Sequence, residues 1–485
     1  MLNILNLILS VNSIPDRVYT FLFKKWRFFV KQILIKNAYV VSMNEKREIY
    51  NNGSILIEND LIKAIGKVDE KSIIDTAEII DAKGKIILPG LINTHVHLSQ
   101  QLGRGIADDV DLLTWLRERV WPYESNFDYE SSLISSTACC VEMIKSGVTT
   151  FLEAGGQYVE AMAEAVKNTG IRAALSKSVM DEGIGLPTNW IKTADEEIQV
   201  QKELFDKYNN TADGRIKIWF GLRTIFNNSD DLIIKTKKIA DELNTGIHMH
   251  IAEIAAENDY VKINRGNSTV EHLHKLGALG PNLLAVHTVW LTDREIDLFR
   301  LYDVKVSHNP AAAMKVVLGF ARIPEMLEKG LNVSIGTDGA PSNNRMDMMR
   351  EMYLTSLIHK GRTLNPKVIP AEQVLEMATI NGAKCALLER EIGSLEVGKK
   401  ADLIILNPNT IHSLPLHDPI ANIVYTMSSE NVESTMCNGK WLMKNREILV
   451  LNESDLIEQV KIKSEEIKTK AKIVLPNRFP VVDII

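Results

Sequence analysis

The stretch Ile86–His97, IILPGLINTHVH, places two histidines one residue apart directly after an apolar run. Residues i and i+2 of a β-strand face the same way, so His95 and His97 can point to one side and share one ion. Two imidazoles suit zinc or iron. Taken alone, the spacing is equally compatible with two hydrogen-bonded histidines that end a strand. The rest of the chain decides between these interpretations.

Seven further apolar runs follow this stretch and alternate with segments that have the spacing of amphipathic helices. They are VTTFLEA (148–154), IRAALSKSV (171–179), IKIWFGLR (216–223), GIHMHIAE (246–253), LLAVHTVW (283–290), VKVSHNP (304–310) and NVSIGTDGA (332–340). Eight strand-like runs that alternate with helices predict an α/β fold, a (β/α)8 TIM-type barrel over residues 90–390.

Short strand-like runs with turn residues between them occupy both ends of the chain. They cover residues 31–89 and, after the barrel, residues 391–485, which close with a helical pattern that Ser454 could cap. We predict a small β-sandwich domain that is built from both chain ends and interrupted by the barrel.

Residues 1–30 form an N-terminal extension of uncertain role. Its apolar run MLNILNLILSV is too short to span a membrane and lacks the leading basic residues of a signal peptide. Attachment to a membrane surface is the alternative interpretation. We expect no membrane span.

Composition excludes several classes of protein. Apolar residues make up 45% and charged residues 24%, the balance of a globular protein in water. The formal net charge is -6 and no basic stripe is present, so we expect no nucleic-acid partner. The four cysteines form no C-x-x-C pair, which favours a reducing, cytoplasmic location over a disulfide framework or a thiolate metal site.

Ionisable residues stand at the ends of the apolar runs, where (β/α)8 barrels carry their catalytic groups. They are His95, His97, Glu153, Arg223, His248, His250, Glu253, His287, His308 and Asp338. Buried polar groups without partners cost a few kcal/mol each. Several of them at one rim therefore indicate a reaction site.

Individual rim residues have more than one interpretation. His250 lies nearer the strand end than His248, so we favour His250 as a metal ligand and expect His248 to be a hydrogen-bonded core residue. Asp338 could ligate a metal and take a proton from bound water, or it could cap the next helix. His287 could be a ligand or could orient the attacking water.

The segment EHLHKLG (271–277) offers a contrast, because His272 and His274 have the same spacing in an apparent helix. Side chains two residues apart diverge on a helix. We therefore expect both histidines at the surface.

The set PGLINTHVHL, HMHIAE, AVHTVW, VSHNPAAAMK and GTDGAPSNN resembles the amidohydrolase superfamily. More narrowly, it is similar to the branch that holds methylthioadenosine/S-adenosylhomocysteine deaminases and triazine hydrolases (chlorohydrolases). The resemblance covers nearly the whole chain after residue 31 and implies metal ligands at His95, His97, His250 and Asp338. It also implies that Glu253 transfers protons to the substrate ring and that His287 positions the attacking water.

The resemblance also bears on the number of metal ions. Binuclear relatives such as dihydroorotase use a carboxylated lysine at the end of strand four, where this chain has Arg223. A guanidinium cannot form that bridge, so we expect one divalent ion, zinc or else iron.

The function implied is that of a hydrolase acting on non-peptide carbon–nitrogen bonds of cyclic amidines. A metal-bound hydroxide attacks the ring carbon of an N-heterocycle and ammonia leaves, with Glu253, His287 and Asp338 as catalytic groups. One alternative is a triazine-type chlorohydrolase or amine-releasing hydrolase, and another is an S-adenosylhomocysteine/methylthioadenosine deaminase. A non-catalytic structural barrel is a remote alternative, because such proteins lose the rim histidines that this chain retains.

The segment LLTWLRERVWPYE (112–124) is similar to the family segment that covers the mouth of the barrel. Its Glu124 corresponds to the glutamate that binds ribose hydroxyls in nucleoside deaminases. The full set of expected substrate-binding residues is Glu124, Trp115, Arg223, Lys177, His308 and Asn309.

Lys177, Arg223 and His308 are the expected substrate-binding residues for which a specific reason or a structural alternative can be given. Lys177 stands where nucleoside deaminases carry an arginine after strand three, and Arg223 adds a fixed positive fork at the rim. Arg223 could instead pair structurally with Glu153 or Asp181, and His308 could bind loop backbone instead of substrate. The expected partner is a small N-heterocyclic substrate, and similar enzymes are commonly homo-oligomers, which we expect here.

Overall fold

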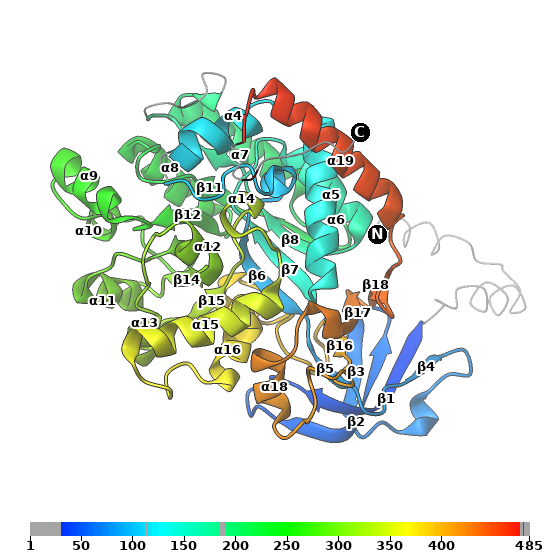
Figure 1. Cartoon of the computed structure of the whole chain (residues 1–485). Coiled ribbons are helices and arrows are strands. Elements are labelled where there is room, and N and C mark those ends of the chain that lie inside the picture. The colour runs from blue at the N-terminus through cyan, green and yellow to red at the C-terminus, as the bar shows by residue number, and fades with distance from the viewer. Residues whose placement is uncertain (1–30, 112–113, 184–185, 187–189, 476–478, 480–485) are drawn as a thin grey trace, which may run out of the picture.

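The computed structural model describes residues 31–111, 114–183, 186, 190–475 and 479 (Figure 1). The predicted N-terminal extension, residues 1–30, lies outside the described residues. Among the described residues, no helix is both long enough and apolar enough to cross a membrane.

The predicted (β/α)8 barrel is confirmed. Its strands are β6 (Leu91–Val96), β7 (Val148–Glu153), β8 (Arg172–Leu175), β9 (Ser178–Val179), β10 (Ile216–Ile218), β11 (Phe220–Leu222), β12 (Ile247–Ile251), β13 (Leu283–His287), β14 (Lys305–His308) and β15 (Val333–Ile335). Every strand pair in this set is parallel. Nearly all strand residues are buried, as expected of strands covered on both faces.

Two of the eight predicted strands are each divided into two short strands. The third run forms β8 and β9, and the fourth forms β10 and β11. Strand β8 pairs with β10 and β9 pairs with β11. The breaks in these two neighbouring barrel strands therefore lie side by side. The barrel closes between the last and first strands, where the Asp338 N–H donates to the His95 carbonyl (2.9 Å).

Helices surround the barrel and lie over its upper rim (Figure 1). The rim elements are the 3-10 helix η2 (Leu98–Gly103), the π-helix η3 (Trp115–Val120), α4 (Trp121–Glu124), α12 (Pro310–Lys315) and α14 (Ala340–Asn343). The others are α5 (Tyr129–Lys145), α6 (Val159–Thr169), α7 (Ala194–Tyr208), α8 (Asp230–Glu242), α9 (Ala255–Arg265), α10 (Thr269–Lys275), α11 (Asp293–Leu301), α13 (Ile323–Glu328), α15 (Met348–Thr363), α16 (Ala371–Ala378) and α17 (Ile380–Cys385).

Strands from both chain ends join in one nine-stranded sheet below the barrel (Figure 1). They are β1 (Gln32–Val41), β2 (Ile49–Glu58), β3 (Leu61–Gly66), β4 (Glu78–Asp81), β5 (Ile86–Pro89), β16 (Leu403–Leu406), β17 (Val432–Cys437), β18 (Lys440–Lys444) and β19 (Glu447–Ile448). The two ends meet where β5 pairs antiparallel with β16. A buried ion pair between Arg172 of β8 and Asp402 (3.1 Å) ties this sheet to the barrel.

The C-terminal helix α19 (Glu453–Lys470) corrects one sequence prediction. Ser454 lies inside the helix, and Asn452 is the N-cap, because its Oδ1 accepts from the backbone N–H of Ser454 (3.0 Å) and Asp455 (3.4 Å). The helix lies beside α5 (Figure 1).

The prediction for His272 was also wrong. Its side chain is buried, and its Nε2 lies 2.8 Å from Asp230 Oδ1 at the start of α8. Helix α10 packs among neighbouring helices, so one of its histidines meets a partner that lies 42 residues away in the sequence.

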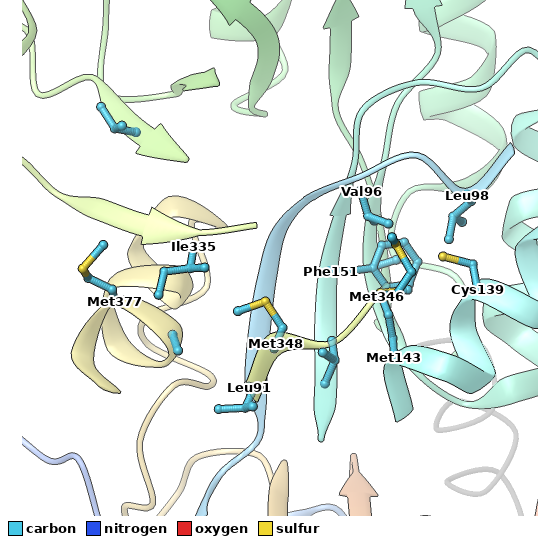
Figure 2. Packing of buried hydrophobic residues seen from close by; sticks show 14 of the residues in the cluster. Leu91, Val96, Leu98, Cys139, Met143, Phe151, Ile335, Met346, Met348 and Met377 are labelled. Carbon is cyan, nitrogen blue, oxygen red and sulfur yellow. The ribbon is translucent and has the colours of Figure 1, made fainter. Parts of the chain in front are cut away.

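An apolar core packs beside the first barrel strand. Figure 2 shows Met143, Phe151 and Met346 gathered beside β6. Asn93 of β6 donates to Thr337 Oγ1 (2.8 Å) and lies 3.6 Å from the Met143 sulfur. This packing holds rigid the strand that ends in the two opening histidines.

Candidate active site

Four side chains from three parts of the barrel converge at its rim. His95 and His97 come from the end of β6, His250 from β12 and Asp338 from the turn after β15. The Nε2 atoms of His97 and His250 lie 3.4 Å apart. Asp338 Oδ1 lies 3.4 Å from His95 Nε2 and 3.6 Å from His97 Nε2.

This donor set fits a divalent metal. One ligand atom from each of the three histidines lies within 4.8 Å of the other two. His95 Nε2 is buried and has no hydrogen-bond partner among the described residues. Burial lowers the pKa of His95 to about 4, and it lowers the pKa of His97 and His250 well below their usual value. Neutral imidazoles with a carboxylate are the ligands that such metals prefer.

The other ring nitrogens of two of these histidines are held in place. His250 Nδ1 lies 2.8 Å from the Arg223 carbonyl, and His95 Nδ1 lies 2.9 Å from His248 Nε2. Hydrogen bonds of this kind fix the tautomer and orientation of a ligating imidazole. His248 is thus the buried, hydrogen-bonded histidine that the sequence predicts.

Glu253 and His287 lie beside these four residues, and a ring nitrogen of His287 lies within 4.8 Å of ligand atoms of His95 and Asp338. Glu253 Oε1 lies 3.6 Å from His287 Nε2. Burial raises the pKa of Glu253, and the nearby His287 opposes that rise. His287 (φ 69°), Thr288 (φ 50°) and Asp338 (φ 64°) adopt left-handed backbone conformations. Such conformations are uncommon outside glycine and cluster at functional sites.

Glu124 and Arg223 line a small cavity, together with Trp121, Met180 and Trp190. Arg223 connects this cavity to the donor set through its carbonyl, which lies 2.8 Å from His250 Nδ1. Glu124 accepts hydrogen bonds from Ser99 Oγ (2.7 Å) and Gln100 Nε2 (3.4 Å). Burial raises the pKa of Glu124, and the Arg223 guanidinium opposes the rise.

Arg223 takes neither of its alternative structural partners. Glu153 accepts instead from the backbone N–H groups of Leu98 (2.8 Å) and Gly155 (3.2 Å). Asp181 accepts from the Ser229 N–H (2.8 Å). The Arg223 side chain therefore remains directed at the cavity.

Lys177 and Trp115 are not brought to this cavity. The Lys177 ammonium forms a buried ion pair with Glu197 of α7 (2.8 Å). Lys177 lies in the break between β8 and β9, and its ion pair directs the side chain to α7, whereas the next residue, Ser178, lines the cavity. The Trp115 indole is buried, with Nε1 3.4 Å from the Pro341 carbonyl.

His308 and Asn309 lie at the end of β14 and are buried. His308 Nε2 lies 3.1 Å from Nε2 of His359 on α15. Neither amide atom of Asn309 has a hydrogen-bond partner among the described residues. Asn309 therefore retains a free amide near the site, whereas His308 uses one ring nitrogen internally.

Sequence reasoning missed the residues that hold the site residues in place. They are Ser99, Gln100, Glu257 and His359. Ser99 and Gln100 lie two and three residues after His97, and this closeness to the THVH motif could have indicated them. His359 stands 51 residues from its partner, and no local pattern connects the two.

Comparisons with known proteins agree with this geometry. A model of the amidohydrolase family matches residues 86–442. The chain is 42% identical over 442 residues to the 5'-deoxyadenosine deaminase of Methanobrevibacter smithii, covering 91% of this chain and 99% of that protein. It is 35% identical over 435 residues to the 5-methylthioadenosine/S-adenosylhomocysteine deaminase of Thermoanaerobacter pseudethanolicus, covering 90% and 99%.

A solved structure is also similar over most of the chain. An adenosine deaminase from Xanthomonas campestris with bound zinc superposes with a TM-score of 0.86 at 27% identity. The match covers 90% of this chain and 99% of that one.

Proposed function

We propose that this chain, which belongs to the amidohydrolase family, removes the amino group from the adenine ring of a 5'-deoxynucleoside. It is a hydrolase that acts on carbon–nitrogen bonds of cyclic amidines. One observation carries the proposal: the possible metal ligands lie together with Glu253 and His287 at the rim, and Glu124 lines a cavity at the same rim.

A divalent metal belongs to this site, and we propose a single zinc ion held by His95, His97 and His250 together with Asp338, whose Oδ1 lies close to His95 and His97. Such an ion makes water a nucleophile at neutral pH. The related adenosine deaminase that was solved with zinc supports this metal. Arg223 supports a single ion, because its guanidinium cannot take the place of a bridging carboxylated lysine.

The chain's own residues supply the proton transfers. In this proposal Glu253 delivers a proton to the ring nitrogen next to the reacting carbon, so that negative charge does not build up there. The partial burial of Glu253 and its position 3.6 Å from His287 support that role. His287 orients the attacking water, and Asp338 accepts its proton.

The residues that line the small cavity have the chemistry to contact the ribose end of the substrate. Glu124, held by Ser99, can accept hydrogen bonds from ribose hydroxyls. Trp121, Met180 and Trp190 give the same cavity an apolar wall, which suits an uncharged 5' group. These features support a 5'-deoxy or 5'-methylthio nucleoside over a triazine ring, which has no hydroxyls for Glu124.

An ammonia-release assay with zinc-loaded protein tests the proposal. The panel contains 5'-deoxyadenosine, 5'-methylthioadenosine, S-adenosylhomocysteine, adenine and atrazine, with chloride release measured in parallel. We expect 5'-deoxyadenosine to have the highest kcat/KM. S-adenosylhomocysteine should have a lower kcat/KM, because Lys177 is paired with Glu197 and so does not offer its charge to the carboxylate of that substrate. Faster chloride release from atrazine than ammonia release from any nucleoside would reject the proposal.

Glu124→Gln supplies a matched variant for the ribose assignment. We expect its KM for 5'-deoxyadenosine to rise at least about tenfold, because an amide cannot accept both hydroxyl hydrogen bonds. Its metal content should not change, since Glu124 is not among the ligands. An unchanged KM would remove Glu124 from the substrate site.

We also expect a homo-oligomer and a cytoplasmic location. All four cysteines are buried and unpaired, which supports a reducing compartment. Size-exclusion chromatography with light scattering tests the first expectation, and a monomer at micromolar concentration would contradict it. Fractionation of the source cells tests the second.

A further inference from the structure

Glu257 is a buried carboxylate four residues after Glu253, and the reaction described above gives it no part. It is the third residue of α9 and is 1% exposed. Its Oε1 accepts from the Ala252 N–H (2.7 Å), and its Oε2 accepts from the Glu253 N–H (3.1 Å). Among the described residues it forms no ion pair, and each of its oxygens accepts from a backbone N–H of the segment that carries Glu253.

That segment is held in an uncommon conformation. Ala252 has φ 51°, in the left-handed region that residues with a Cβ rarely adopt. Its carbonyl accepts from the N–H groups of Val289 and Trp290 (3.0 Å each), just after His287. The peptide at Ala252 thus joins the loop of Glu253 to the loop of His287, and the two side chains meet across this junction at 3.6 Å.

We propose that Glu257 is a positioning residue that fixes the direction of Glu253 toward the substrate ring and thereby sets kcat. This inference rests on the proposed function, because Glu257 acts through the proton transfer by Glu253. Glutamine at this position could accept only one of the two N–H groups, and its own NH2 would face the other. A displacement of about 1 Å at a reacting group can cost about 100-fold in rate.

A double-mutant cycle tests the proposal on the zinc-loaded full chain with 5'-deoxyadenosine. We expect Glu257→Gln to lower kcat about 10- to 100-fold, with KM within about twofold and unchanged metal content. In a Glu253→Gln background the same change should lower kcat less than about twofold, because no proton donor is left to position. An equal loss in both backgrounds, or a raised KM at unchanged kcat, would overturn the proposal.

Glu295→Gln is the matched control. Glu295 is also the third residue of its helix, α11, and is 1% exposed. It accepts from the Thr292 N–H (2.8 Å) and from Ser268 Oγ (2.6 Å), away from the reacting groups. We expect a fall in Tm similar to that of Glu257→Gln but less than about a twofold change in kcat in either background.

Two further comparisons keep the result decisive. If Glu257→Gln does not fold, Glu257→Asp replaces it, because aspartate keeps the charge but is one methylene too short to reach both N–H groups. Wild-type kcat in Glu253→Gln alone would reject the proton transfer itself, and the role of Glu257 with it. An inactive Glu253→Gln with a fully active Glu257→Gln would reject only the role of Glu257.

Discussion

Replacement of Glu253 by glutamine removes one ionisable proton and leaves the size of the side chain unchanged. The side chain is 18% exposed, and its Oε1 lies 3.6 Å from His287 Nε2. An amide fits the same space without repacking. Because burial raises the pKa of Glu253, the charged form is disfavoured there. The neutral amide should therefore leave the free energy of unfolding equal to that of the wild type or slightly higher.

The expected loss lies in the chemical step. Proton transfer by a positioned side chain contributes about 10²- to 10⁴-fold in rate, or about 2.7–5.5 kcal/mol of barrier. We expect kcat for 5'-deoxyadenosine to fall about 1000-fold in Glu253→Gln, with KM changed by less than about threefold. Ammonia release measures kcat, elemental analysis measures bound metal, and thermal melting measures stability.

Glu203→Gln controls for the chemical change, since Glu203 is exposed on α7 and accepts a hydrogen bond from Gln199 of the same helix (2.7 Å). It should retain wild-type kcat and Tm. Activity of Glu253→Gln within tenfold of the wild type would refute the proton-transfer role. Loss of bound metal in Glu253→Gln would point instead to a role for this carboxylate in metal binding.

Three other expectations follow from the same geometry. His97→Ala and Asp338→Ala should each lower bound zinc below half occupancy by elemental analysis, and full occupancy in both would contradict the ligand assignment. Burial raises the pKa of Glu351 to about 8 in the folded chain. The protonated side chain therefore stabilises the fold fully below about pH 4.5, and the free energy of unfolding falls by up to roughly 5 kcal/mol as the pH rises from there to 8. Glu351→Gln should flatten that decline in denaturant titrations, and an unchanged pH dependence would contradict the assignment. Arg172→Met leaves Asp402 buried without its partner and should cost about 3–5 kcal/mol of unfolding free energy, so a loss below 1 kcal/mol would show that water relieves the charge.

The local pattern of the sequence predicted the barrel and the place of its polar groups. Strand-like runs that end in His97, His250, Glu253, His287 or Asp338 need no long-range information to be recognised. Once eight such runs are read as parallel strands, the barrel brings their ends to one rim. The joint position of these residues therefore follows from topology.

The direction in which individual side chains point could not be predicted from the sequence pattern. Lys177 was expected at the substrate but pairs with Glu197 of α7, because it lies in the break between β8 and β9, next to that helix. His272 was expected at the surface but meets Asp230. Each outcome depends on which neighbour packs against one face of an element, and the chain contains no local signal for that choice.

By itself, the sequence determined the fold class, the rim position of the polar residues and the family, since these depend on periodicity and on short motifs such as THVH. Only the tertiary structure decided which atoms meet. His97 and His250 are separated by 153 residues, yet their Nε2 atoms lie 3.4 Å apart. The role of Glu257 likewise depends on the fold, because only there do its two oxygens accept from the N–H groups of Ala252 and Glu253. Distances of this kind arise from the packing of the closed barrel, because the side chains can meet only after all eight strands have taken their register.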